Sequence, residues 1–113
     1  MEPTELFTHS ERVFSKCIEV MKKKNADYSS SSTDAFRNFK AVEQFGITNV
    51  ENGILVRLTD KLMRMSSLLS NEAQVKEETL LDTIEDAINY LVILHAYHYQ
   101  KPINSSNDTP ICQ

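Results

Sequence analysis

The chain of 113 residues is 41% hydrophobic and 25% charged, and it carries a formal net charge of −4. These values fit one ordinary globular domain and exclude a fibrous or wholly disordered chain. The negative charge also argues against binding to duplex nucleic acid, which depends on Lys and Arg side chains that neutralise phosphates. Because no N-terminal apolar stretch suggests secretion or membrane insertion, we expect a cytoplasmic protein without a membrane partner.

The composition favours helices over strands. Two glycines and three prolines are few for a sheet of short strands, which needs frequent turns. Apolar residues recur instead at three- and four-residue steps, which is typical of amphipathic helices. We therefore predict an all-α bundle of four to five helices, with one domain at residues 1–100 and a flexible tail at 101–113. The two cysteines, Cys17 and Cys112, are expected to be free thiols.

The first predicted helix covers residues 4–24 and stops at Asn25. A second, short helix follows, and either Thr33 or Asp34 can cap its N-terminus. Gly46 is placed to end this helix, because glycine readily adopts the left-handed conformation that follows a last helical turn. The two helices are thus predicted to be separated by a polar segment.

That segment begins with KNADYSSSS, residues 24–32. Four consecutive serines mainly supply flexibility, so one interpretation is a simple hinge. The preceding Asn25, Asp27 and Tyr28 bring an amide, a carboxylate and an aromatic ring, which are groups that can hold a small ligand. The residues alone leave both interpretations open.

Two longer helices are predicted in the second half of the chain. Thr48 and Glu51 have the spacing of a capping box, which predicts the start of a third helix that runs to about Ser70. The fourth helix is predicted from about Val75 to about Tyr99.

The fourth helix separates apolar from acidic residues. Its apolar side is predicted to carry Leu81, Ile84, Ile88, Leu91, Val92 and His95, and its polar side Glu78, Asp82, Glu85, Asp86 and Asn89. The simpler interpretation is that the acidic side faces water. However, the run YLVIL at residues 90–94 is apolar on every side, which is typical of a buried helix. The acidic residues would then lie beside an enclosed region, where a cation must offset their repulsion.

The third helix offers partners for these acids. Its polar side groups Gly53, Arg57, Asp60, Arg64 and Ser67. Several carboxylates beside an amide and basic side chains suit Mg²⁺, which commonly bridges carboxylates to the phosphates of a nucleotide. The small Gly53 would allow close approach by a ligand or by neighbouring backbone.

Four segments together carry a family resemblance: KNADY (24–28), FRNF (36–39), GILVRLTDKLMRMSSLL (53–69) and LLDTIEDAINY (80–90). Over residues 14–94 approximately, the chain resembles small phage and bacterial "nucleotide modification associated" domains, which are related to the MazG-like all-α nucleoside triphosphate pyrophosphatases. The resemblance implies a MazG-like helical bundle that forms a homodimer or homotetramer. It also implies Mg²⁺, with Mn²⁺ as a substitute, and hydrolysis of an NTP, dNTP or modified nucleotide to the monophosphate and pyrophosphate. A phage-encoded protein of this kind would act in the host cytoplasm.

The resemblance and the residue chemistry together nominate three groups of site residues. The candidate catalytic residues are Asp60, Asp82 and Asp86, which with Asn89 are also the candidate metal ligands. The candidate phosphate-binding residues are Lys24, Arg57, Lys61 and Arg64. The candidate base- and sugar-binding residues are Asn25, Asp27, Tyr28, Arg37 and Asn38. Phe36 and Phe39 are expected to pack in the core, although their rings also offer flat surfaces for a base.

One departure from the wider superfamily keeps an alternative open. Its first metal-binding helix usually carries a Glu-x-x-Glu pair, whereas here Asp60 is followed by Lys61 and Arg64. A site with fewer acids and more cations would bind a nucleotide without activating water. The alternative function is therefore non-catalytic nucleotide binding, such as a phage factor that sequesters a host signalling nucleotide or assists DNA-base modification. A helical interaction module with a merely solubilising acidic side is a third interpretation.

Overall fold

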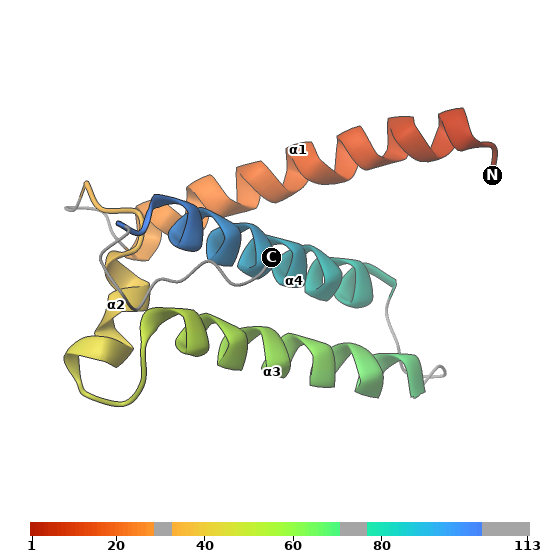
Figure 1. Ribbon diagram of the computed structural model, residues 1–113. Coiled ribbons are helices and arrows are strands. Elements are labelled where there is room, and N and C mark those ends of the chain that lie inside the picture. Colours follow the sequence, from red (N-terminus) through yellow and green to blue (C-terminus); the bar gives the residue numbers. More distant parts are fainter. Residues whose placement is uncertain (29–32, 71–76, 103–113) are drawn as a thin grey trace.

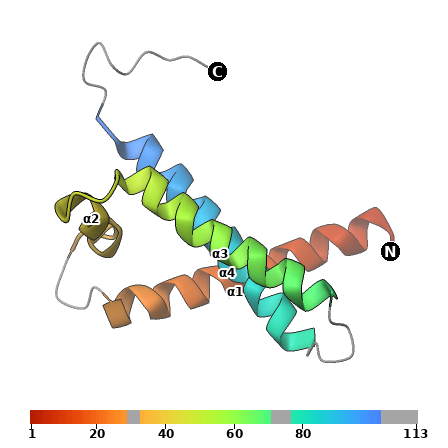
Figure 2. The same ribbon diagram turned by 90° about the horizontal axis from the view of Figure 1, so that it is seen from below.

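The computed structural model describes residues 1–28, 33–70 and 77–102. Within these ranges it contains four helices and no strand: α1 (Pro3–Tyr28), α2 (Arg37–Gln44), α3 (Val50–Ser70) and α4 (Glu77–Gln100). The all-α prediction is therefore confirmed. Helix α4 lies between α1 and α3, and α3 and α4 run antiparallel (Figure 1). Seen from below, α1 crosses the α3–α4 pair obliquely (Figure 2). The predicted serine hinge, the expected start near Val75 and the predicted tail from residue 103 onward lie outside the described residues.

Helix α1 is longer than predicted. It continues through Asn25 and Asp27 and ends at Tyr28. Residues 4–28 contain no Gly or Pro, and Asn or Asp in a helix costs at most roughly 0.7 kcal/mol relative to Ala. The basic run at residues 22–24 therefore lies inside the helix, more than one turn before its end.

Helix α2 is set up by the turn before it. The side chain of Asp34 accepts a hydrogen bond from the N–H of Phe36 at 2.9 Å, and its other oxygen lies 2.6 Å from Lys40 Nζ. Asp34 thus stabilises the approach to the helix, while Phe36 is the residue at its N-terminal boundary. Gly46 follows the helix with φ of 75°, as predicted for a residue that ends it.

The predicted capping box at the start of α3 is not formed. Asn49, and not Thr48, supplies the cap, because its side-chain oxygen accepts a hydrogen bond from the N–H of Asn52 at 2.7 Å. Glu51 is used elsewhere: its carboxylate oxygens lie 2.6 Å from His98 Nδ1 and 2.9 Å from Lys101 Nζ. These contacts tie the start of α3 to the end of α4 and fix their antiparallel pairing.

Helix α4 buries its polar side as well as a small-residue side. Thr83 and Ala87 are buried, and the hydroxyl of Thr83 donates to the carbonyl of Thr79 at 2.8 Å. Glu85 and Asn89, on the predicted polar side, are only 9% and 7% exposed, because α1 covers them. The simpler interpretation, in which the acidic side faces water, is therefore wrong at these positions.

Within the part of the chain that the structure describes, much of the apolar side of α4 is exposed. Leu81 and Leu91 are 47% and 52% exposed, and His95 is exposed as well. On α3, exposed leucines recur every seven residues. Seven-residue spacing puts these three leucines on one side of α3. We call the exposed leucines of the two paired helices together the α3–α4 apolar face: Leu55, Leu62, Leu69, Leu81 and Leu91.

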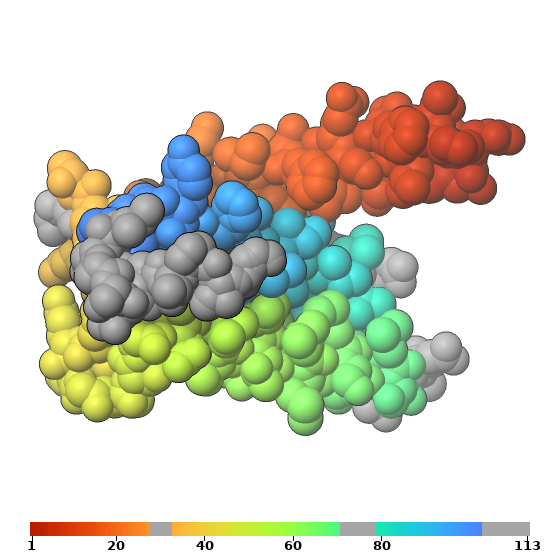
Figure 3. Space-filling model, in the orientation of Figure 1, coloured from red at the N-terminus to blue at the C-terminus, as the bar shows by residue number. Residues whose placement is uncertain are grey.

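Helix α1 extends past the rest of the molecule at its N-terminal end (Figure 3). Phe7 and Phe14 on this helix are 63% and 56% exposed. Contact with the bundle begins around Cys17, which is 3% exposed. None of the helices described here combines the length and apolar character needed to cross a membrane.

Candidate functional site

A pocket of about 720 Å³ opens where the C-terminal half of α1 meets α2, α3 and α4. Pockets that bind small molecules usually have volumes of roughly 300–1,000 Å³. Its α1 wall comes from residues 18–25, its α2 wall from residues 35–39, and its α4 wall from residues 86–96. Of the α1 residues that line the pocket, only Asn25 lies in the segment that the sequence predicts as a break.

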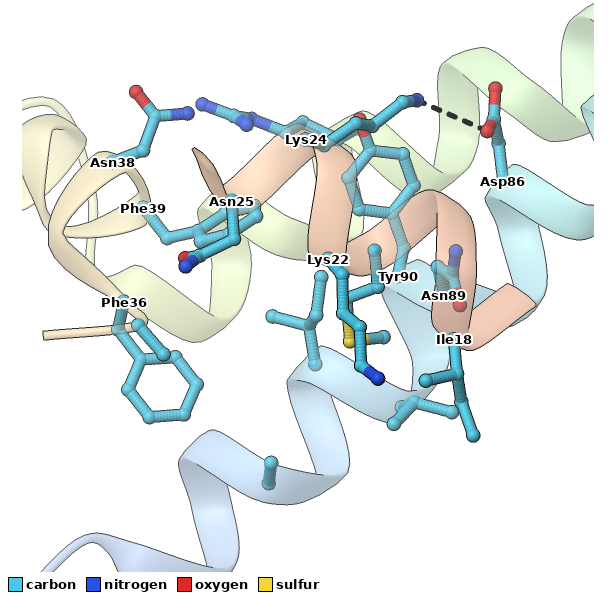
Figure 4. Close-up of a pocket in the computed structure, with 16 residues that line it drawn as sticks. Ile18, Lys22, Lys24, Asn25, Phe36, Asn38, Phe39, Asp86, Asn89 and Tyr90 are labelled. Atoms are coloured by element: carbon cyan, nitrogen blue, oxygen red, sulfur yellow. Dashed lines mark hydrogen bonds and ion pairs between the residues drawn. The ribbon is translucent and has the colours of Figure 1, made fainter. Parts of the chain in front are cut away.

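Aromatic rings form one part of the wall. Phe36, Phe39 and Tyr90 line the pocket (Figure 4). Each is held by an edge-to-face contact: Phe36 with Tyr97 at 5.3 Å between ring centroids, and Phe39 with Tyr90 at 6.5 Å. Such contacts add roughly 0.5–1.5 kcal/mol beyond burial and fix the ring planes. The two phenylalanines, expected in the core, are only partly buried and present surface to the pocket.

A cation lies on this aromatic wall. The guanidinium carbon of Arg57 is 4.7 Å from the centroid of the Phe39 ring, which is cation–π geometry. Arg57 comes from α3 and lines the pocket together with Lys22 and Lys24 of α1. Two of the candidate phosphate-binding residues, Lys24 and Arg57, are therefore brought to the same pocket.

Asp86 joins three helices at the edge of the pocket. Its Oδ1 lies 3.1 Å from Lys24 Nζ of α1, and its Oδ2 lies 3.1 Å from Lys61 Nζ of α3. Figure 4 shows Lys24 reaching across to Asp86 while Lys22 points in another direction. Burial raises the pKa of Asp86, but the hydrogen bonds and charges of Lys61 and Lys24 outweigh burial and hold the pKa below its ordinary value.

A second group of charges lies on the outer part of the α1–α4 contact. Lys16 Nζ is 3.5 Å from Asp82 Oδ1 and 3.3 Å from Glu85 Oε1. The Asp82 side chain is 62% exposed and is not part of the pocket wall. The hydrogen bond that Lys16 donates to Glu85, then the charge of Glu85, raise the pKa of Lys16 above its ordinary value, with smaller contributions from Asp82. This group mainly attaches α1 to α4.

The side-chain amide of Asn89 has a hydrogen-bond partner within the protein. Its side-chain N–H donates to the carbonyl of Cys17 at 3.0 Å. The other side-chain atom, Oδ1, is buried and accepts no hydrogen bond from the described residues. Asn89 therefore holds α4 against α1 beneath the pocket.

The residues as arranged do not fit the predicted Mg²⁺ site. Mg²⁺ is bound by several oxygen ligands in near-octahedral geometry. Asp86 has an ammonium group at each carboxylate oxygen, Asp82 pairs with Lys16, and Asp60 is exposed and outside the pocket wall. Among residues 1–28, 33–70 and 77–102, no group of three or more His, Cys, Asp or Glu side chains is positioned to hold a metal ion.

The pocket collects about half of the candidate site residues. It is lined by Lys24, Asn25, Asn38, Arg57, Asp86 and Asn89, and Lys61 reaches it through its ion pair with Asp86. The remaining candidates with described side chains are exposed and outside the pocket wall: Asp27, Arg37, Asp60, Arg64 and Asp82. The side chain of Tyr28 lies outside the described part of the chain.

Two contributors to the site were missed. Tyr90 is the last residue of LLDTIEDAINY, and its ring follows Asp86 by four residues, which places both on one side of α4. That spacing indicates from the sequence alone that Tyr90 lies beside Asp86. Lys22 was not singled out, because a basic run before a predicted helix end suggests only a favourable interaction with the helix dipole.

No family model matches the chain, and no curated protein or solved structure is significantly similar to it. The chemistry of the pocket therefore carries the functional argument.

Proposed function

We propose that the chain is a nucleotide-binding protein whose ligand occupies the pocket between α1, α2 and α4. One observation carries this proposal: three aromatic rings and three cations line the same pocket. Rings offer stacking surfaces for a base, and ammonium or guanidinium groups offer charge for phosphates. A purely apolar ligand would make no use of the charge of these cations, and inorganic phosphate alone would leave the rings unused.

The orientation of the ligand follows from where these groups lie. Phe36, Phe39 and Asn38 are on the α2 side, so we assign the base and sugar to that side (Figure 4). Lys24 and Lys61 meet at Asp86 on the other side, where we assign the phosphates. Amide side chains can satisfy the hydrogen-bonding edge of a base.

Titration calorimetry with the eight common NTPs and dNTPs, in EDTA, tests the proposal. We expect at least one nucleotide to bind and to be recovered intact. Phe39→Ala should weaken that binding by roughly tenfold or more, since stacking on one ring contributes about 1–3 kcal/mol. Phe7→Ala is the matched control, because Phe7 is an exposed ring on α1 outside the pocket. Absence of binding across the panel, or equal losses in both variants, would contradict the proposal.

The pyrophosphohydrolase implied by the family resemblance is the second candidate function. Asp82, Glu85 and Asp86 all lie on the side of α4 that meets α1, within two turns. Their shared side of α4 is the observation that favours hydrolysis, which would require Mg²⁺ to displace the lysines that pair with them. Release of pyrophosphate from an NTP or dNTP in Mg²⁺ or Mn²⁺, lost in both Asp82→Asn and Asp86→Asn, would favour this candidate over simple binding.

We also propose that the chain forms a homodimer through the α3–α4 apolar face. Its leucines at positions 55, 62 and 69 repeat every seven residues, which is the spacing of a helix–helix seam. A second copy related by two-fold symmetry would present the same charge-free pattern, so apolar groups would meet apolar groups. A partner with a charged surface would find no opposite charge on these leucine side chains.

A further inference from the structure

Asp86 interacts with both lysines that we assign to the phosphate side of the pocket. One carboxylate on α4 is held by one ammonium from α1 and one from α3, each at 3.1 Å. The Asp86 side chain is 20% exposed, and those of Lys61 and Lys24 are 27% and 48% exposed. Lys24 and Asp86 line the pocket, Lys61 contacts Asp86 directly, and all three groups are partly shielded from water.

Charge counting shows that Asp86 leaves the pocket positive. Lys22, Lys24 and Arg57 on the pocket wall and Lys61 beside it supply four positive charges and Asp86 one negative charge, which leaves a formal excess of three. The whole chain has a net charge of −4, so this excess is local. A focused positive region in a concave site attracts anions even on an acidic protein.

A metal ion and a phosphate group would affect this arrangement differently. A cation bound to Asp86 would displace two ammonium groups and then lie beside them, which is electrostatically unfavourable. A phosphate group would attract the same two ammonium groups, but it would lie close to the carboxylate and be repelled by it. Asp86 therefore competes with the ligand for Lys24 and Lys61.

We propose that Asp86 is a resident counter-anion: it holds Lys24 and Lys61 in position in the free protein and yields them to the phosphate of a metal-free nucleotide. This inference rests on the proposed nucleotide-binding function and deepens it. It reverses the role that the family resemblance implies for Asp86, because a metal ligand is required for binding, whereas a counter-anion opposes it.

The test is the sign of the effect of Asp86→Asn on affinity. Calorimetry in EDTA, with the NTP and dNTP panel and with inorganic tripolyphosphate, should show binding about tenfold tighter or better in Asp86→Asn, since one close like charge is removed. Glu19→Gln removes the same charge from an exposed position on α1 outside the pocket, and it should leave affinity unchanged. If Asp86→Asn does not fold, Asp86→Ser removes the same charge with a smaller side chain.

The outcomes distinguish the nucleotide-binding proposal from the counter-anion proposal. Tighter binding by Asp86→Asn than by a wild type that itself binds supports the counter-anion. Equal or weaker binding by the variant, or binding that needs Mg²⁺ and is lost in the variant, overturns the counter-anion and leaves nucleotide binding standing. Failure of wild type to bind any nucleotide overturns the proposed function and the counter-anion with it, whether or not the variant binds.

Discussion

Gly53 of α3 lies directly against Val42 of α2, so that a Cβ atom added to Gly53 would be 2.7 Å from Val42 Cγ2. That distance is too short for two carbon atoms, and a β-branched side chain has little freedom to move aside. The sequence had suggested close approach at Gly53 by a ligand or by backbone, and the neighbour is a side chain of the helix that carries Phe39. The glycine therefore sets the position of the α2 wall of the pocket.

Gly53→Ala should consequently weaken nucleotide binding by displacing α2. Alanine favours the helix over glycine by about 1 kcal/mol, so the melting temperature should fall less than the clash alone would cause. This gain does not return α2 to its place in the pocket wall. We expect a loss of affinity of several-fold, measured by calorimetry, with little change in helix content.

Adding Val42→Ala to Gly53→Ala provides the control, because it removes the clashing methyl groups. The double variant should recover most of the lost affinity, as expected for residues in direct contact. An effect of Gly53→Ala that Val42→Ala fails to relieve would show that α2 is not positioned by this contact.

The stabilising effect of Asp86 should disappear in acid. Its pKa is lowered in the folded protein, so the unfolded chain takes up the proton first as the pH falls. The contribution is thus complete above the ordinary Asp pKa of about 3.9 and is lost as the pH falls through the lower folded value. We expect wild type to exceed Asp86→Asn in unfolding free energy by about 1 kcal/mol at pH 7, since the pair is partly exposed.

Urea unfolding followed by circular dichroism at pH 7 and pH 3 measures this difference. The gap between wild type and Asp86→Asn should shrink toward zero at the lower pH, while Glu19→Gln serves as the control for lost net charge. An unchanged gap at pH 3 would mean that the ion pairs with Lys24 and Lys61 do not cause it.

The thiol of Cys17 should react slowly in the folded protein. It is 3% exposed, with Sγ 3.9 Å from the carbonyl of Glu85, and burial, followed by the charges of Glu85 and Asp86, raises its pKa. Because the thiolate is the reactive form, labelling in a Cys112→Ser variant should be on the order of 100-fold slower in buffer than in urea. Similar rates in both conditions would show that α1 separates readily from α4.

The α3–α4 apolar face should mediate dimerisation. Sedimentation velocity of wild type at tens of micromolar is expected to give about twice the monomer mass, and Leu62→Glu combined with Leu91→Glu should give a helical monomer, because the paired charges would be desolvated in the interface. Phe7→Glu is the control on an exposed apolar residue outside this face. A monomeric wild type, or dissociation by Phe7→Glu alone, would exclude this interface.

Apolar spacing was enough to predict the four helices, because it reports which residues share a side of a helix. It did not reveal which side another helix covers. The sequence places Asp82, Glu85, Asp86 and Asn89 on one polar side of α4, yet Glu85 and Asn89 are buried because Lys16 and Cys17 of α1 supply their partners. Such pairings between distant segments are invisible in one sequence.

The candidate site was predicted only in part, because one sequence does not show which side of each helix faces the others. Asp60 and Lys61 are adjacent on α3, but only Lys61 points to Asp86, because neighbouring residues on a helix are about 100° apart. The pocket position of Asn25 depends on α1 continuing past it, which weak helix propensities at Asn and Asp do not prevent. The sequence therefore indicated which kinds of side chain could bind a nucleotide. It did not indicate which of those side chains face the pocket.

Side-chain amide signals in a ¹H–¹⁵N NMR titration offer the most direct measurement of nucleotide binding in this pocket. Asn25, Asn38 and Asn89 line it on three different walls, and each has an NH₂ group that reports on its surroundings. Adding the bound nucleotide in EDTA should shift the signals of Asn25 and Asn38 while those of Asn52, exposed on α3, stay in place. Shifts confined to residues outside the pocket, or none at saturating nucleotide, would contradict nucleotide binding at this site.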